Sequence, residues 1–242
     1  MTVSALFRQM LRPSEPQPDG RRTRSMWKLL ALLLVPCVSL MLQSLAGSGT
    51  ESQTTSLHDL KYCGTIPQTT AYSCGAAAIA CLLGMYFGIP TTETGVLEMA
   101  EQQISARGEE PGLRHGLTAY DLKTASEALG LDMVGYELTH TQLQDYFARG
   151  GLPLIAHVVE PQAHYLVVVG MTPHHVLLSD PAWGRYIAPV RELADVRGMS
   201  GVFLVPLPGM KEAQHARGAQ LCALEWMQSR VFQLSNLREV ML

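Results

Sequence analysis

The second half of the chain is divided into short runs rich in β-branched residues, and this pattern limits the possible fold most strongly. Turn residues such as Glu160-Pro161 and Thr172-Pro173 separate the runs. Runs of this length between turns are typical of antiparallel strands joined by hairpins. The sequence therefore predicts an antiparallel sheet in this half of the chain. The runs are LPLIAHVV (152–159), HYLVVVG (164–170), HVLLSD (175–180), GRYIAPV (184–190) and GVFLVPL (201–207).

Helices are expected before this sheet. Residues 74–87 read CGAAAIACLLGMYF, a composition typical of a buried helix, and Gly88 with Pro90 provides a stop signal. Thr118 and Thr139 stand where helix N-caps are expected. Helices followed by strands predict an α+β fold, with helices packed on an antiparallel sheet. The further elements expected are helices over 92–105, 119–129 and 139–148 and a strand over 132–138.

Three side chains in this framework form a possible catalytic set. Cys74 opens the first predicted helix, where the positive end of the helix dipole favours the nucleophilic thiolate. His164 begins a hydrophobic strand, so its imidazole is held rigidly and can still exchange a proton in a cleft. Asp180 ends the next strand, sixteen residues after His164, and one hairpin brings its carboxylate beside the imidazole.

Neighbouring residues fit the same chemistry. Gln68 precedes Cys74 by six residues, and its amide is a candidate donor to an oxyanion, together with the Cys74 N–H. Gly75 leaves room for a substrate backbone, and Trp183 is a candidate lining residue of the cleft. Taken singly, a helix cysteine, a strand histidine and an Asp-Pro turn are ordinary structural features. Their order, spacing and element types together favour a catalytic interpretation.

Composition and motifs exclude several other functions. The balance of 18 Lys+Arg against 21 Asp+Glu gives a net charge of -3, which provides no basic surface for nucleic acid. No two histidines have the HExxH spacing and no cysteines form a CxxC pair, so we expect no metal and no cofactor. His157 lies inside a predicted strand and is interpreted as structural.

These residues together resemble peptidase family C39, a papain-like family of cysteine peptidases. The resemblance covers about 62–207 and implies a papain-like fold and a protein or peptide substrate. It implies Cys74 as nucleophile, His164 as base, Asp180 as the residue that orients the base and Gln68 as oxyanion donor. The residues that carry it are Gln68-(x5)-Cys74-Gly75-Ala76-Ala77, His164-Tyr165 and Asp180-Pro181-(x2)-Gly184.

Within that family the chain is similar to exported single-domain members that accompany secreted-fibre systems, such as the functional-amyloid (Fap) system of Pseudomonas. This similarity implies processing of a secreted protein in a functional-amyloid or fibre secretion pathway. A catalytically silent binding module or secretion chaperone is the alternative of a different class. Transfer of the acyl group to an amine instead of water is a further alternative that the residues leave open.

The amino-terminal segment predicts export. Residues 29–42 (LLALLLVPCVSLML) carry no charge, follow a flank that includes Arg21 and Lys28, and precede small polar residues. This order is typical of a secretory signal peptide, with cleavage expected after Ala46. An uncleaved inner-membrane anchor over 26–46 and a buried helix are the alternatives. Cleavage or anchoring places the rest in the periplasm or at the periplasmic face of the inner membrane.

The remaining chain divides by composition. We expect a signal peptide or anchor over 1–46, a Gly/Ser/Thr-rich linker over 47–60, the peptidase domain over 61–208 and a helical tail over 209–242. The tail is expected to dock on its own domain or to face a partner, such as a secretion-system component, or a membrane. Its apolar residues recur near heptad spacing, at Leu221, Leu224, Met227, Val231 and Leu234.

The other cysteines leave two possibilities. In an oxidising compartment Cys63 could pair with Cys81 or Cys222, and the alternative is that all three are free thiols. Cys81 lies two helical turns from Cys74, about 10 Å along the helix axis, which exceeds disulfide reach. We therefore expect the Cys74 thiol to stay free.

Overall fold

A computed structural model describes residues 56–112 and 116–240. The predicted signal peptide or anchor over 1–46 lies outside the described residues. The helices and π-helical turns are α2 (Leu57–Lys61), α3 (Cys74–Cys81), η1 (Leu82–Tyr86), α4 (Glu93–Ala106), α5 (Ala119–Ala128), α6 (His140–Ala148), η3 (Glu192–Val196) and α7 (Met210–Val240). The strands are β1 (Met133–Glu137), β2 (Leu154–Val158), β3 (His164–Met171), β4 (His175–Asp180), β5 (Gly184–Pro189) and β6 (Met199–Pro206).

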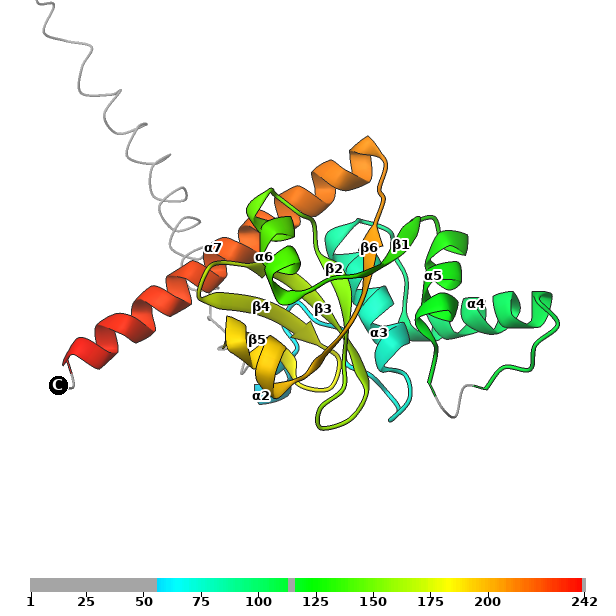
Figure 1. Ribbon diagram of the computed structural model, residues 1–242, viewed down its shortest axis with the longest axis horizontal. Coiled ribbons are helices and arrows are strands. Elements are labelled where there is room, and N and C mark those ends of the chain that lie inside the picture. The colour runs from blue at the N-terminus through cyan, green and yellow to red at the C-terminus, as the bar shows by residue number, and fades with distance from the viewer. Residues whose placement is uncertain (1–55, 113–115, 241–242) are drawn as a thin grey trace, which may run out of the picture. The chain divides into compact units, whose positions relative to one another are not determined.

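The strands form one antiparallel sheet in the order β1-β6-β2-β3-β4-β5 (Figure 1). Hairpins join β2 to β3, β3 to β4 and β4 to β5, as the turn residues between the runs predict. β6 then returns across the sheet to lie between β1 and β2. The predicted α+β class, with helices packed on an antiparallel sheet, is confirmed.

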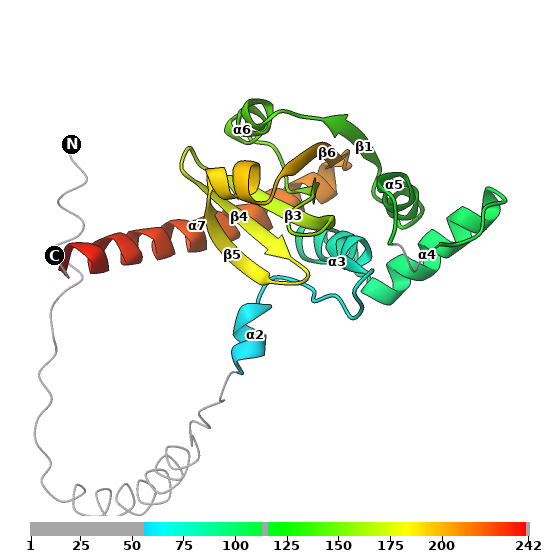
Figure 2. The ribbon, with the colours of Figure 1, turned by 60° about the horizontal axis from the view of Figure 1, so that its bottom comes forward.

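Alternating side chains of the central strands fill two separate cores. In β3, Val167 and Val169 pack in the core that contains α3, whereas Leu166 and Val168 pack in the core that contains α6. A strand covered on both faces is apolar at nearly every position, which explains the continuous run HYLVVVG. Helices α3 and α6 accordingly lie on opposite sides of the sheet (Figure 2).

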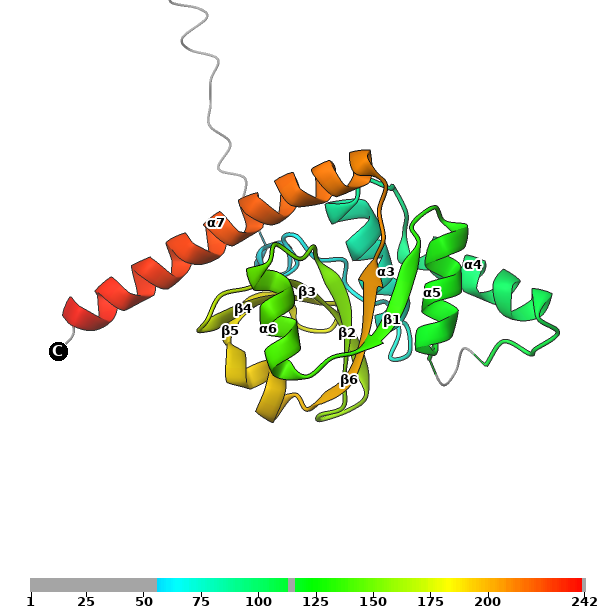
Figure 3. The same cartoon turned by 45° about the horizontal axis from the view of Figure 1, so that its top comes forward.

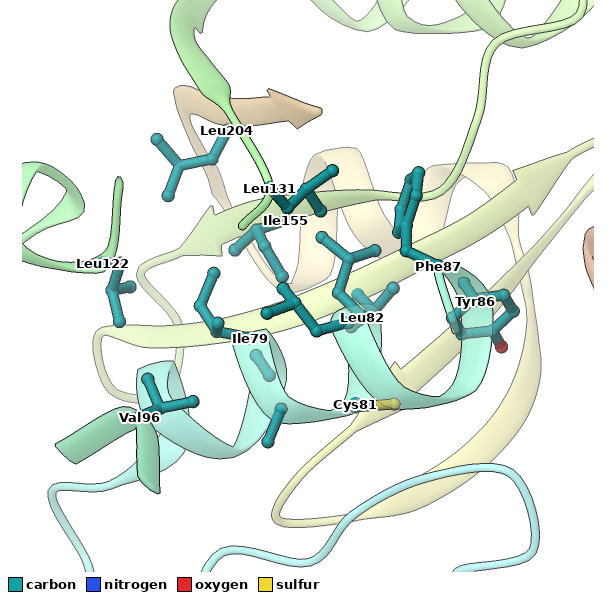
Figure 4. Packing of buried hydrophobic residues seen from close by; sticks show 14 of the residues in the cluster. Ile79, Cys81, Leu82, Tyr86, Phe87, Val96, Leu122, Leu131, Ile155 and Leu204 are labelled. Atoms are coloured by element: carbon teal, nitrogen blue, oxygen red, sulfur yellow. The ribbon is translucent and has the colours of Figure 1, made fainter. Parts of the chain in front are cut away.

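The helix that begins at Cys74 is held in the larger core. Its alanines are fully buried, because small side chains let α4, α5 and the sheet approach its backbone closely. Larger side chains farther along, such as Ile79 of α3 and Leu82 of η1, pack in the same core as Ile155 and Leu131 (Figure 4). Burial of each Leu or Ile side chain contributes about 1.5–3 kcal/mol. The nucleophile candidate therefore stands on a rigid support.

The predicted N-caps are present at both positions. Thr118 caps α5 and Thr139 caps α6, and each forms a reciprocal capping box with the residue three positions later, Asp121 or Gln142. Such boxes satisfy two of the free amide groups at a helix start, which fixes where each helix begins. Near the start of the described residues, α2 covers the last part of the predicted linker 47–60.

The first half of α7 docks on the domain, and the second half runs out beyond the sheet (Figure 3). The buried residues of the docked face are Ala216, Gln220, Ala223 and Met227, and the partly buried Leu224 and Val231 of the predicted stripe pack against the same core. The predicted heptad stripe is partly wrong, because Leu221 and Leu234, at 52% and 65% exposed, face solvent. Small residues allow close approach to η1 and β3, and hydrophobic periodicity does not register alanine and glutamine as a docking face.

Gln220 connects α7 to the domain through two backbone carbonyl groups. Its Nε2 donates to the carbonyl oxygen of Val169, at the bulge in β3, at 2.8 Å and to that of Gly151 at 2.9 Å. The Gln220 side chain is itself buried, so these two hydrogen bonds offset the cost of removing its amide from water. Among residues 56–112 and 116–240, no helix is long and apolar enough to cross a membrane.

We predict that Gln220→Ala lowers the free energy of unfolding by about 1–3 kcal/mol, because it removes both hydrogen bonds from this side chain to the carbonyls of Val169 and Gly151. Urea denaturation followed by circular dichroism measures the change. Gln228→Ala, at an exposed position on the same helix, is the matched control and should unfold like the wild type. Equal stabilities of the two variants would contradict the docking role of Gln220.

Candidate active site

The loop that enters α3 leaves the amino terminus of this helix open. Ser73 is the N-cap residue, yet its side chain makes no capping hydrogen bond. Its hydroxyl instead donates to the carbonyl oxygen of Thr70 at 3.1 Å and accepts from the Thr70 N–H at 3.0 Å. The amide groups of the first turn, next to the Cys74 thiol, therefore remain available for negative charge.

His164 and Asp180 meet across the β3–β4 hairpin. The ladder pairs Val167 with Ser179. Continued by one residue, this register sets Asp180 diagonally across from His164, a separation that long side chains can span. Nε2 of His164 lies 2.7 Å from Oδ1 of Asp180. The structure thus brings together the two residues that the sixteen-residue spacing suggested.

The Asp180 carboxylate is fully buried and surrounded by donors. Besides His164, Oδ1 accepts from the backbone amides of Ala182 at 2.8 Å and Trp183 at 3.2 Å. Oδ2 accepts from Nη2 of Arg197 at 2.7 Å. Burial disfavours the charge, but the contacts with His164 and these other donors hold the pKa of Asp180 below its usual value. The carboxylate is therefore ionised and fixed in orientation.

The pKa values of the two thiols of α3 are shifted in opposite directions. Burial works against ionisation of Cys74, but hydrogen bonds from His164 and from the Tyr165 backbone amide outweigh it and lower the pKa of this thiol. Cys81 lies deeper in the same helix, and burial there raises its pKa to about 12. Cys74 consequently forms the thiolate more readily than an ordinary thiol, whereas Cys81 is an inert core residue. Both are free thiols, as are Cys63 and Cys222.

His164 is the cationic partner of that thiolate. Burial disfavours the imidazolium, but the hydrogen bonds to Asp180 and Cys74 and their negative charges raise the pKa of His164 to about 9. Between the low pKa of the thiol and this value, the pair exists as thiolate and imidazolium. This form supplies a ready nucleophile and a proton for a leaving amine.

A hollow of about 220 Å³ lies beside His164. Gln68 and Trp183 line it, together with Arg197 and the segment before His164. Nε2 of Gln68 donates one hydrogen to the carbonyl oxygen of Thr70 at 2.9 Å, and its second hydrogen remains available. Trp183 is 61% exposed. Both residues therefore stand where the sequence placed them, at the edge of a cleft that contains the imidazole.

Gly75 needs a different explanation from the predicted one. It is buried, and a Cβ atom at this position would lie 2.8 Å from Cδ1 of Leu122 and 3.3 Å from Cδ2 of Tyr165. The space beside Gly75 is thus filled by α5 and β3, which corrects the expectation that a substrate backbone occupies it. The glycine allows α3 to pack closely enough to bring Cys74 to His164.

Two residues around the site differ in how well the sequence indicates them. His157 sits beside Tyr165, with ring centroids 4.7 Å apart, in agreement with its structural interpretation. Arg197, which contacts Asp180, is not indicated by the sequence. It follows the π-helical turn η3 in a loop, so neither periodicity nor a motif points to it.

The arrangement of thiol, imidazole and carboxylate agrees with the match of residues 63–205 to the model of the Peptidase C39 family. The chain belongs to the peptidase C39 family. It is a cysteine peptidase with the papain-like fold of that family.

Individual relatives show varying degrees of similarity. FapD of Pseudomonas aeruginosa, described as a probable functional amyloid protease, is 27% identical over 177 residues, 72% of this chain and 74% of the relative. An uncharacterized protein of Methanothermobacter thermautotrophicus is 30% identical over 146 residues, 59% of this chain and 88% of the relative.

Solved structures with a similar backbone include two peptidase domains. The domain of Streptococcus ComA, described as a bi-functional ABC transporter, is 21% identical, with a TM-score of 0.49, and the match covers 60% of this chain and 98% of that domain. A double glycine motif protease from an AMS/PCAT transporter is 24% identical, with a TM-score of 0.48, over 60% and 91% of the two chains.

We predict that iodoacetamide alkylates Cys74 at lower pH than an ordinary thiol, because the lowered pKa of Cys74 preserves the thiolate there. Proteolytic activity should fall as the pH rises through about 9, where His164 loses the proton needed by the leaving amine. Peptide-resolved mass spectrometry measures the alkylation, with exposed Cys63 in the same sample as reference. His164→Gln should shift the Cys74 reaction to higher pH, and an unchanged profile would contradict the ion pair.

Proposed function

We propose that this peptidase is exported and cleaves a secreted protein of a functional-amyloid or fibre secretion pathway. In this proposal Cys74 is the nucleophile, His164 the base and acid, and Asp180 the residue that orients His164. The observation that carries these roles is the buried Asp180–His164 contact of 2.7 Å, which supports an imidazolium next to the Cys74 thiol.

Acylation begins when Sγ of Cys74 attacks the carbonyl carbon of the scissile bond. A carbon–sulfur bond forms and the carbonyl oxygen becomes an oxyanion, which the Cys74 N–H and the free Nε2 hydrogen of Gln68 are placed to stabilise. The carbon–nitrogen bond then breaks. The leaving nitrogen takes the proton of the His164 imidazolium, and the acyl group remains on Cys74 as a thioester.

Deacylation uses the same groups in the reverse order. His164, now neutral, takes a proton from a water molecule that attacks the thioester carbonyl. The carbon–sulfur bond breaks, the acid product leaves and the thiolate–imidazolium pair is restored. Throughout both steps Asp180 keeps the imidazole in one orientation, as the carboxylate of a catalytic triad does.

Sequence similarity to FapD, a probable functional amyloid protease, supports the fibre pathway. The uncharged run 29–42 and its basic flank support export to the periplasm or to the periplasmic face of the inner membrane. Contact with secretion-system components through α7 stays a prediction. A protein or peptide substrate follows from the peptidase family, and its cleavage site can be found from the amino termini of the secreted proteins.

We predict that Cys74→Ala abolishes the processing of the secreted substrate and leaves the protein folded, because only the nucleophile is removed. Full-length variants are expressed in a deletion strain, and the amino termini of secreted proteins are compared by mass spectrometry. Wild type should create at least one terminus that the Cys74→Ala strain lacks. The wild-type protein itself should appear in the periplasmic or inner-membrane fraction, beginning at Gly47 if the signal is cleaved.

Cys63→Ala is the matched control, since Cys63 is an exposed thiol outside the site. This variant should process the substrate like the wild type. Identical secreted termini in the wild-type and Cys74→Ala strains would refute the proposed role of Cys74. A terminus that depends on Cys74 but belongs to a protein unrelated to fibres would refute only the pathway.

A further inference from the structure

Arg197 is a largely buried cation on the far side of Asp180 from His164. Its side chain is 12% exposed, and its Nη2 lies 2.7 Å from Oδ2 of Asp180. Among residues 56–112 and 116–240, Asp180 is the one residue with which Arg197 forms a salt bridge. The carboxylate is thus held between two cationic groups, the imidazolium of His164 on Oδ1 and the guanidinium on Oδ2.

The backbone of Arg197 supports the other partner of this pair. Its carbonyl oxygen accepts hydrogen bonds from the N–H groups of Val159 at 3.2 Å and Glu160 at 2.9 Å. These two residues begin the segment that leads to His164. One residue therefore braces both the carboxylate of Asp180 and the approach to the histidine.

The proposed reaction explains why two cations are needed. His164 is charged before acylation and neutral after it gives its proton to the leaving group. At that stage Asp180 would be a fully buried anion without a counter-charge, which is a costly state. A guanidinium does not lose its proton in this pH range, so its charge stays constant. His164, in contrast, carries a positive charge for only part of the catalytic cycle.

We infer that Arg197 is a positioning residue that keeps Asp180 ionised and stationary while His164 changes its charge. The inference rests on the proposed roles of Cys74, His164 and Asp180. It assigns a function to a residue that touches neither the thiol nor the scissile bond.

The other titratable groups around the site do not replace this charge. Tyr186 faces Asp180 from β5, and burial raises its pKa to about 12, so it is neutral. His157 of β2 lies beside Tyr165, and burial together with the charge of His164 lowers the pKa of His157. Glu192 of η3 lies near Tyr186 and Arg197 and carries the opposite sign.

The sign of the expected pH effect follows from the charge. Removal of a fixed positive charge raises the pKa of every neighbouring acid, here Asp180, the Cys74 thiol and the His164 imidazolium. The Cys74 alkylation profile should therefore move to higher pH in Arg197→Gln, which removes the charge. It should stay in place in Arg197→Lys, which retains it. A merely structural role would lower the height of the profile without moving it.

The test measures the pH profile of Cys74 alkylation by iodoacetamide in the full-length wild type and in both variants. Arg191→Gln is the matched control, because Arg191 is exposed at the opposite end of η3. The inference is supported if only Arg197→Gln shifts the profile upward. A profile of Arg197→Gln that coincides with the wild type, or an equal shift in Arg197→Lys, would overturn it. This readout needs no substrate, so an error in the proposed pathway does not affect it.

A second measurement keeps the inference testable if Arg197→Gln does not fold. In His164→Gln, Arg197 is the remaining cation on Asp180, and the carboxyl carbon of Asp180 can be titrated by ¹³C NMR. We expect Asp180 to stay ionised below its ordinary pKa of 3.8. Protonation at or above that value would show that Arg197 does not hold the charge, and would overturn the inference.

Discussion

The burial of the Asp180 carboxylate is the constraint on which the rest of the site depends. A carboxylate without solvent contact is tolerated only with full compensation, and donors from three separate places in the chain provide it. His164 comes from the start of β3, the amides of Ala182 and Trp183 from the β4–β5 turn, and Arg197 from the end of η3. Because each donor sits on or beside the sheet, displacement of any of these elements removes part of the compensation of a buried charge. The sheet thus positions the Asp180 carboxylate, which in turn orients the His164 imidazole.

The helix at the other side of the cleft shows how position along one element determines reactivity. Cys74 and Cys81 share α3, but Cys74 lies at the uncapped amino terminus next to His164, and Cys81 lies in the apolar core. The first environment lowers the pKa of the thiol and the second raises it. Gly75 and the buried alanines make this possible, because small side chains let α3 approach α5 and β3 closely enough to present its first residue to the histidine.

Sequence patterns predicted the parts of this arrangement that depend on local structure. The runs between turn residues located the strands, and the sixteen-residue spacing of His164 and Asp180 indicated a shared hairpin, because register in a hairpin is local. Arg197 gave no signal, since its approach to Asp180 results from the tertiary placement of η3. The docked face of α7 was predicted only in part for a similar reason, because two alanines and Gln220 are buried in the contact, whereas Leu221 and Leu234 are exposed. The role of Gly75 could not be read from the sequence, since only the packed structure shows what fills the space beside its Cα.

If His164 and Asp180 activate Cys74 as proposed, Cys74 forms a covalent acyl-enzyme. The most direct measurement is intact-protein mass spectrometry of the full-length enzyme, quenched with acid during turnover of the secreted substrate found by comparison of amino termini. We expect a mass increase equal to the amino-terminal product less one water, located on the Cys74 peptide and removed by hydroxylamine. Complete turnover with no adduct on Cys74 in wild type, together with turnover by Cys74→Ala, would contradict it.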